Sequence, residues 1–253
     1  MKRLLLTIFI LVVILIKMYA VRPFITDDAA VTGNRQFQLE TWALFDKFSG
    51  QHWNMLAYGF QDQLEVALGA VLGYDRSTPK HSKFSYAVPL LEMKYLFYKY
   101  QPNKLPGIAL AAGSFLPSGK GAFVPPGYGA YSFLTATQCF GKDENVLIHG
   151  NIGVNYLYAN SKNQFVAFWG VGTQIKTYKG LHFVGEVISS DPYVSGKDLA
   201  YQTGFRYFIN DLIQVDAEIG QGITGKNKIP FWGGFGARFV ITKFEKKKNR
   251  LFN

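Results

Sequence analysis

Cysteine is nearly missing from this chain, because Cys139 is the only one among 253 residues. An internal disulfide is therefore excluded, and the fold has to be stabilised by burial and by backbone hydrogen bonds. Long apolar runs are also missing beyond residue 20, where no stretch approaches the roughly 18 to 20 apolar residues that a transmembrane helix needs. The sequence therefore excludes a helical membrane protein.

Motifs for nucleotide binding and catalysis are equally scarce. The sequence contains no glycine-rich phosphate loop and no catalytic-triad spacing, so no cofactor is expected. The formal charge of +10 is concentrated at the two ends, with Lys2, Arg3 and Lys17 at one end and a net positive tail at the other. Little basic character remains between them, and no nucleic-acid partner is expected.

The amino terminus has the three-part layout of a secretory signal peptide. Lys2 and Arg3 precede an apolar run over residues 4–16, and a short stretch then ends at Ala20. We expect residues 1–20 to be a signal peptide that is removed near Ala20. An uncleaved inner-membrane anchor is the alternative, although about thirteen apolar residues are few for a span.

What the chain has in abundance is alternation of apolar and polar residues. Over residues 146–158, Ile148 and Ile152 fall on one face of an extended strand, whereas His149 and Asn151 fall on the other. Successive side chains of a strand point to opposite faces, and helical spacing would scatter the same residues around the axis. The pattern recurs at residues 63–74, and no helical segment separates the repeats.

Twelve segments are predicted to be strands. They cover residues 36–45, 52–60, 63–74, 90–99, 107–116, 129–140, 146–159, 164–177, 181–189, 199–208, 212–220 and 231–241. Long connections alternate with tight turns, as in bacterial barrels with long extracellular loops and short periplasmic turns. The predicted fold class is all-β, a transmembrane antiparallel up-and-down β-barrel of about 12 strands over residues 36–241, with both termini periplasmic. A soluble two-sheet sandwich is the alternative.

Aromatic residues are frequent, with 22 Phe and 15 Tyr, and glycine reaches 26, yet the mean hydropathy is only +0.03. This composition fits a barrel in which lipid-facing and interior-facing residues alternate. Trp42, Trp53, Trp169 and Trp232 lie on or near predicted strand ends, so we expect them in aromatic girdles at the two membrane surfaces.

A family resemblance starts at the expected mature amino terminus. Residues 22–29 read Arg-Pro-Phe-Ile-Thr-Asp-Asp-Ala, residues 91–95 read Leu-Glu-Met-Lys-Tyr, and residues 116–119 read Leu-Pro-Ser-Gly. These stretches resemble the outer-membrane family named for the putative MetA-pathway of phenol degradation, over residues 22–239. The resemblance implies a transporter-like barrel in the outer membrane of a Gram-negative bacterium. The barrel-assembly machinery, an expected partner, typically reads a terminal aromatic, and here Phe252 is penultimate.

If the apolar faces meet lipid, charges of both signs line the interior. The predicted lumen-lining residues are Glu40, Glu65, Glu92, Lys94, Arg206, Asp216, Glu218 and Arg238. They could brace the interior through ion pairs, since charges away from water must find partners. They could also form the selectivity lining of a narrow solute path, and the two roles are compatible.

Two segments outside the strands are candidates for narrowing the path. Residues 21–35 form a predicted periplasmic segment whose Asp27 and Asp28 could enter the mouth of the barrel as a partial plug. Residues 117–128 form a long loop in which Phe123 and Tyr128 could fold over the outer mouth and stack against a solute; an ordinary surface loop is the alternative. Residues 242–253 form a basic tail that we expect to be solvated.

The function that these observations favour is passive uptake of small molecules, hydrophobic or aromatic ones among them, across the outer membrane. A structural or adhesive barrel without transport is one alternative. A lipase-like barrel hydrolase is another, since His149 and Asn151 share a strand face, but no serine lies two residues from either. His182 and Glu186 also share a face, yet two ligands without a third make no metal site.

Overall fold

The computed structural model describes residues 25–76, 84–141, 145–190, 199–224 and 228–242. The expected signal peptide, residues 1–20, and the basic tail from residue 243 onward lie outside these described residues. The strands are β1 (Phe37–Asp46), β2 (Ser49–Gln61), β3 (Leu64–Asp75), β4 (Phe84–Tyr98), β5 (Gly107–Phe115), β6 (Gly119–Lys120), β7 (Tyr128–Phe140), β8 (Val146–Ala159), β9 (Lys162–Tyr178), β10 (Leu181–Ser189), β11 (Leu199–Asn210), β12 (Ile213–Gly222) and β13 (Trp232–Ile241).

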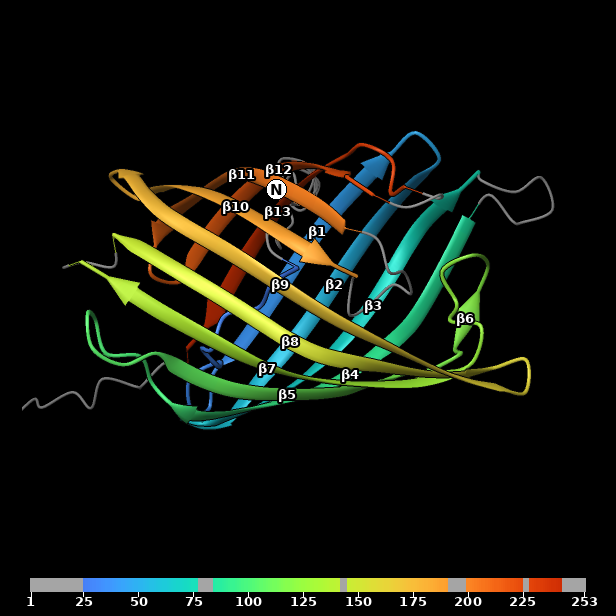
Figure 1. Ribbon diagram of the computed structural model, residues 1–253, viewed down its shortest axis with the longest axis horizontal. Coiled ribbons are helices and arrows are strands. Elements are labelled where there is room, and N and C mark those ends of the chain that lie inside the picture. The colour runs from blue at the N-terminus through green and yellow to red at the C-terminus, as the bar shows by residue number, and fades with distance from the viewer. Residues whose placement is uncertain (1–24, 77–83, 142–144, 191–198, 225–227, 243–253) are drawn as a thin grey trace, which may run out of the picture.

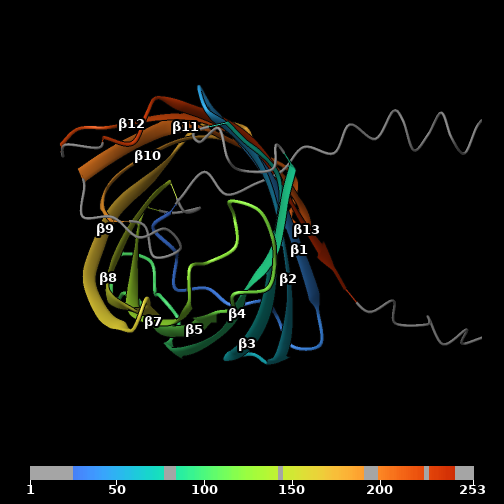
Figure 2. The same cartoon turned by 90° about the vertical axis from the view of Figure 1, so that its right-hand side faces the viewer.

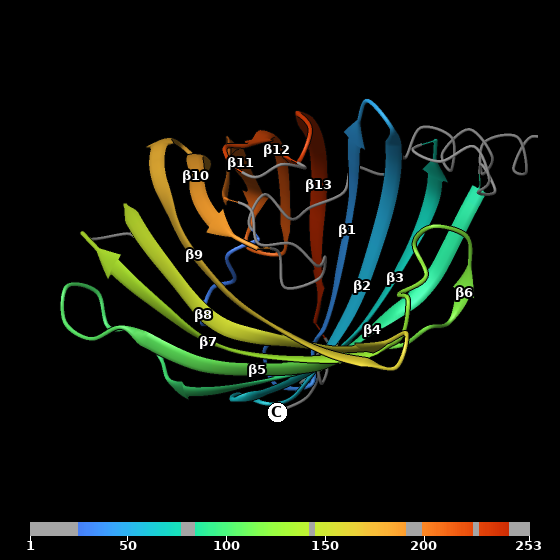
Figure 3. The same ribbon diagram turned by 45° about the vertical axis from the view of Figure 1, so that its right-hand side comes forward.

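The strands form one closed antiparallel sheet (Figures 1 and 3). Each long strand pairs with its neighbours in the chain, and β1 pairs with β13 from Phe37↔Ile241 to Asp46↔Trp232, which closes the ring. The two-residue β6 continues β5 along β4, so twelve long strands make the wall. Because the first strand pairs with the last, the sheet has no free edge strand, and the predicted twelve-stranded barrel is confirmed. Among the described residues, no helix has the length and apolarity that a membrane crossing requires.

Two rims can be distinguished. The terminal rim is the one where β1 begins and β13 ends, and the tight turns after β2 and β9 lie on it. The loop rim is the opposite one, which carries the β1–β2 hairpin and the connection between β6 and β7 (Figure 3).

The outer face of the wall is apolar. Leu68, Ile152 and Phe205 are 49%, 66% and 53% exposed, and their strand neighbours on the inner face are buried or half-buried. A soluble protein does not leave a continuous apolar surface of this kind in water, whereas a membrane barrel must present one to lipid. The alternation that predicted the strands therefore also predicts which side meets hydrocarbon.

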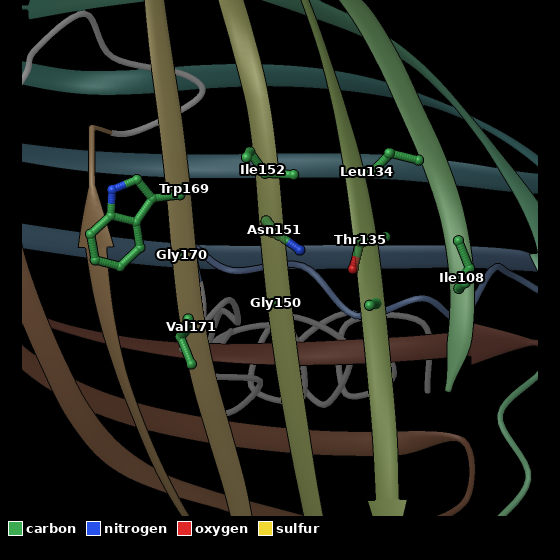
Figure 4. Close-up of a pocket in the computed structure, with 10 residues that line it drawn as sticks. Ile108, Leu134, Thr135, Gly150, Asn151, Ile152, Trp169, Gly170 and Val171 are labelled. Carbon is green, nitrogen blue, oxygen red and sulfur yellow. The ribbon is translucent and has the colours of Figure 1, made fainter. Parts of the chain in front are cut away.

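A shallow apolar groove of about 440 Å³ interrupts the outer wall between β5 and β9. Gly150 lies at its centre, and Figure 4 shows Trp169 and Val171 on one side of it and Ile108 on the other. A Cβ atom added to Gly150 would meet nothing within 4 Å, so the absence of a side chain here leaves the wall hollow.

Two strands begin three or more residues earlier than the sequence predicts. β2 starts at Ser49 rather than at residue 52, and β4 starts at Phe84 rather than at residue 90. In β4 the register against β3 shifts between Gly69 and Val71, and Pro89 and Leu90 are both buried. This irregularity breaks the alternation of buried and exposed residues. The sequence pattern therefore predicts that the strand begins after the irregularity, although the strand continues through it.

Candidate functional site: the barrel interior

The segment that precedes β1 lies inside the barrel. Figure 2 views the barrel from one end, with this segment, shown in blue, inside the ring of strands. The backbone N–H groups of Ile25 and Thr26 donate to the two carboxylate oxygens of Glu186 on β10, both over 2.7 Å. Glu186 also accepts a hydrogen bond from Gln202 at 2.6 Å. This carboxylate therefore holds the beginning of the described chain.

Asp27 is held through its main chain as well as its side chain. Its N–H donates to Asn151 Oδ1 over 2.6 Å, and its carbonyl accepts from Asn151 Nδ2 and from Thr135 Oγ1, both at 2.8 Å. Further along, Ala29 N donates to Thr137 Oγ1 at 2.8 Å and Thr32 N donates to Glu65 Oε2. Side chains from four strands thus substitute for the β-sheet partner that this segment lacks.

Lys94 supplies the positive charge of this region. Its Nζ lies 2.8 Å from Asp27 Oδ2 and 3.9 Å from Asp28 Oδ1. Enclosure within the barrel would raise the pKa of the Asp28 carboxyl, but the charges of Lys94, His149 and Arg238 outweigh it and hold the pKa below its ordinary 3.8. Asp28 therefore keeps its negative charge at neutral pH.

A second polar group lies on β9, β11 and β12. Arg206 donates from Nε to Asp216 Oδ1 at 2.9 Å and from Nη1 to Gln174 Oε1 at 2.7 Å. Glu218, two residues beyond Asp216, is 5% exposed, and within the described chain neither of its carboxylate oxygens has a hydrogen-bond partner. Glu40 and Arg238 are direct neighbours across the β1–β13 closure.

All eight predicted lumen residues therefore lie on the inward-facing side of their strands. The structure brings Glu65 and Lys94 together with the amino-terminal segment, and Arg206 together with Asp216. It places Glu92 in a different setting, since this carboxylate accepts a hydrogen bond of 2.6 Å from the Tyr131 hydroxyl. What these residues do to a solute stays a proposal.

Aromatic and aliphatic side chains cover another part of the inner wall. Their buried members are Trp42, Met55, Ala57, Ala67, Leu90, Ala111, Tyr131, Phe133 and Phe168, with Leu44, Trp53 and Phe115 packed against them. We call this set the apolar arc, because it follows the inside of the wall from β1 round to β9. It lies nearer the loop rim than the Thr135 and Thr137 hydroxyls that hold the amino-terminal segment.

The arc is built from ring contacts between neighbouring strands. Trp42 and Trp53 stack with centroids 5.7 Å apart, and Phe133 meets Phe168 edge to face at 5.8 Å. The last pair reaches across β8 because Gly153 lies between the rings. A Cβ atom at that position would lie 2.5 Å from Phe133 Cβ and 2.7 Å from Phe168 Cζ.

The expected positions of three tryptophans were wrong. Trp42, Trp53 and Trp232 lie on inward faces rather than in outer girdles, and Trp232 packs with Ile188 and Ala200 inside the barrel. Trp169 does face outward and is 42% exposed. The face of a tryptophan is predicted by the alternation along its strand and not by its closeness to the strand end. Trp42 alternates in step with the inward-facing Gln38 and Glu40.

The connection before β7 also needs correction. Tyr128 is the first residue of β7, opposite Tyr158, and is 65% exposed on the outer face, so it does not belong to a mouth loop. Phe123 is half-buried within the connection. Next to it, Ala122 N donates to the inward-facing Ser85 Oγ at 2.7 Å, so this connection begins by folding toward the interior.

The residues considered for catalysis have structural partners. His149 Nδ1 lies 3.0 Å from Thr137 Oγ1, and Asn151 is occupied by Asp27. His182 lies 3.2 Å from Gln174 Nε2, while Glu186 binds the main chain of residues 25 and 26. Among the described residues, no group of three or more His, Cys, Asp or Glu side chains is arranged to hold a metal ion.

A closed antiparallel barrel with an apolar outer surface and a charged interior defines the class of outer-membrane β-barrel proteins. Within that class, the chain belongs to the family described as Putative MetA-pathway of phenol degradation, whose model matches residues 20–239.

Solved structures with the same fold include the COG4313 outer membrane channel from Pseudomonas putida F1. It is 9% identical to this chain with a TM-score of 0.56, and the match covers 84% of this chain and 96% of the other. The NanC porin matches at 8% identity and a TM-score of 0.53, covering 82% and 99%. The KdgM porin in complex with disordered oligogalacturonate matches at 7% and 0.54, covering 81% and 98%. No curated protein sequence matches significantly.

Proposed function

We propose that this protein is a passive outer-membrane channel for the uptake of small apolar or aromatic molecules. The observation that carries the proposal is the apolar arc. In a barrel with a water-filled interior, the positions of Trp42, Tyr131, Phe133 and Phe168 would be occupied by polar side chains. Aromatic faces at an inner wall can replace the hydration of an apolar solute, and the neighbouring polar groups can orient it.

The comparisons support transport over the alternatives. The structural neighbours carry the names of porins and of an outer membrane channel, and the family name refers to phenol degradation. A phenol has the composition that the interior favours, an aromatic ring with one hydroxyl. The lipid bilayer and a small solute are the partners that this function requires, together with the barrel-assembly machinery for insertion.

The amino-terminal segment acts in this proposal as a plug of the terminal rim. Asp27 and Asp28 are its charged anchors, through Lys94, and Glu186 and Asn151 hold its main chain. The connection with Phe123 narrows the loop rim, since its neighbour Ala122 is bonded to Ser85.

The plug is tested by deleting residues 22–34 and recording single-channel conductance in planar bilayers. Removing chain from the interior widens the path, so we expect a several-fold larger conductance. Equal conductance of the deleted and full-length proteins would count against the plug.

Uptake is tested with the fluorescent aromatic probe N-phenyl-1-naphthylamine in intact cells that express the protein. Cells with the wild type should take the probe up faster than cells without it, and Trp42→Leu combined with Phe133→Leu should slow the uptake. Trp169→Leu, on the outer face, is the matched control and should leave uptake unchanged. Uptake no faster than in cells without the protein would exclude the proposed channel.

The same cells separate the remaining functions. We propose that the protein performs no catalytic step, because His149 and Asn151 are engaged with Thr137 and Asp27. Ester hydrolysis without uptake would favour the hydrolase, and the absence of both would leave a structural or adhesive barrel.

A further inference from the structure

Three inward-facing carboxylates on β10 and β12 differ in what they bind. Glu186 uses both oxygens on the main-chain N–H groups of residues 25 and 26. Asp216 accepts hydrogen bonds from Arg206 Nε at 2.9 Å and from Gln214 Nε2 at 3.0 Å. Glu218 is buried as well, yet within the described chain neither of its carboxylate oxygens has a hydrogen-bond partner. This carboxylate lacks the donor that usually offsets the loss of hydration.

The surroundings of Glu218 are negatively charged. The charges of Asp216 and Glu186 act on its carboxylate, and the cation that offsets them is Arg206. Arg206 is already engaged, because its Nε and Nη1 donate to Asp216 and Gln174. What Glu218 lacks is therefore a positive charge as well as a hydrogen-bond donor.

The interior as a whole has the same excess of negative charge. Among the described residues, ten carboxylate side chains are buried or half-buried, against three cations. The carboxylates are those of Asp27, Asp28, Glu40, Asp46, Glu65, Asp75, Glu92, Glu186, Asp216 and Glu218, and the cations are Lys94, Arg206 and Arg238. An enclosed path lined in this way attracts cations and repels anions.

The Glu218 carboxylate also lies next to the apolar arc. Its register neighbours on β11 and β13 are Gly204 and Gly234. Gly234 leaves room for it, because a Cβ atom there would collide with Glu218 Oε1 and would lie 2.7 Å from Leu44 Cδ2. Leu44 packs against the apolar arc. A solute with its ring against the arc can therefore direct a charged substituent toward Glu218.

The apolar cluster on this side of the interior includes a residue of the segment that precedes β1. Leu44 and Ile25 both pack against the cluster of Ile188, Ala200 and Trp232. Ile25 belongs to the segment that acts as the plug in the proposed function, and its N–H is held by Glu186. Displacement of this end of the plug would give a solute access to the buried carboxylate.

We propose that Glu218 binds the ammonium group of the solute and that the channel takes up small aromatic amines in preference to aromatic acids. An ammonium supplies the missing charge together with three N–H donors. A metal ion fits less well, because no group of three or more His, Cys, Asp or Glu side chains in the described chain is arranged to hold one. This inference rests on the proposed uptake function and adds the chemical class of the solute.

Block of the ion current in planar bilayers tests the site. The probe is the phenethylammonium ion, compared with phenethyl alcohol, its neutral counterpart, and with hydrocinnamate, an anion of similar size. Mildly alkaline buffer limits competition from protons for the carboxylate. We expect the ammonium ion to block the potassium current at about tenfold lower concentration than the alcohol, and hydrocinnamate not to block it. Glu218→Gln should remove the difference between the ammonium ion and the alcohol.

Asp211→Asn is the matched control, because it removes one negative charge from an exposed tight turn of the terminal rim and should keep the difference. Folded barrel is measured in each sample by its heat-dependent shift in electrophoretic mobility. Equal block by the three probes, or a difference that survives Glu218→Gln, would overturn the inference.

Equilibrium dialysis of phenethylammonium against the folded protein in detergent separates this inference from the proposed function. Binding that Glu218→Gln weakens, without any ion current, would contradict the channel and support the site. Ion current without preferential binding of the amine would contradict the site alone.

Discussion

Among single residues, Lys94 combines burial, charge and a link to a segment far away in sequence. Its side chain is 5% exposed and that of Asp27 is 16% exposed, so water solvates neither charge well. A buried ammonium is tolerated only with close partners, and here a carboxylate lies 2.8 Å away. Lys94 therefore couples the position of the amino-terminal segment to the wall.

Replacing Lys94 with methionine should destabilise the barrel and release the segment. The change leaves the Asp27 carboxylate inside the barrel without its cation, which typically costs roughly 3 kcal/mol. The urea midpoint in lipid vesicles measures the loss, and protease sensitivity near residue 27 reports the release. Lys179→Met, whose ammonium lies 6.0 Å from the Tyr178 ring centroid at a tight turn, is the control. Unfolding curves that coincide for wild type and Lys94→Met would contradict this role.

Two glycines of β8 make a second test at the same scale. Gly153 faces inward between Phe133 and Phe168, whereas Gly150 faces the outer groove and has open space around it. Gly153→Ala should lower stability by about 1 to 3 kcal/mol, because the added methyl group would crowd the Ser132 carbonyl oxygen as well as Phe133 and Phe168. Gly150→Ala should not be destabilising, because its methyl group enters hydrocarbon. Thermal unfolding of both variants checks the contrast, and equal losses would contradict the crowding around Gly153.

The sequence predicts inward-facing charges better than inward-facing aromatics. A buried charge needs the interior of a barrel, so alternation alone places residues such as Glu65 and Arg206. Tryptophan is compatible with lipid, interface and interior, and its position near a strand end therefore predicted the wrong face for Trp42 and Trp53.

At the scale of elements, strands were predictable and their irregularities were not. Ten or more residues of alternation identify β3 and β8. The prediction for β4 was too short, because the alternation breaks at Pro89 and Leu90. The two-residue β6 has no periodicity of its own. Both features arise from pairing with neighbours rather than from local sequence.

The position of the amino-terminal segment was also only partly predictable from the sequence. The charges of Asp27 and Asp28 suggested that it enters the barrel, but nothing local indicates that Glu186, Asn151 and Thr135 hold its main chain. These partners lie more than a hundred positions away in the chain, and the register of several strands decides which of their side chains meet the segment.

For the whole molecule, closure of the ring determines which residues become neighbours. It makes Glu40 and Arg238 adjacent although they belong to the first and last strands. Closure also divides the interior, with the apolar arc from β1 round to β9 and the group of Arg206, Asp216 and Glu218 on β11 and β12. An apolar solute with a polar substituent can contact both parts, and this division underlies the proposed uptake.

The most direct measurement is quenching of tryptophan fluorescence by lipids with brominated acyl chains, which act only on rings that touch hydrocarbon. Trp169 is on the outer face, whereas Trp42, Trp53 and Trp232 are on the inner face. Quenching should disappear in Trp169→Phe and persist in Trp42→Phe. If quenching instead persisted in Trp169→Phe and fell in Trp42→Phe, the aromatic rings of the arc would face lipid, and the interior path for apolar solutes would be contradicted.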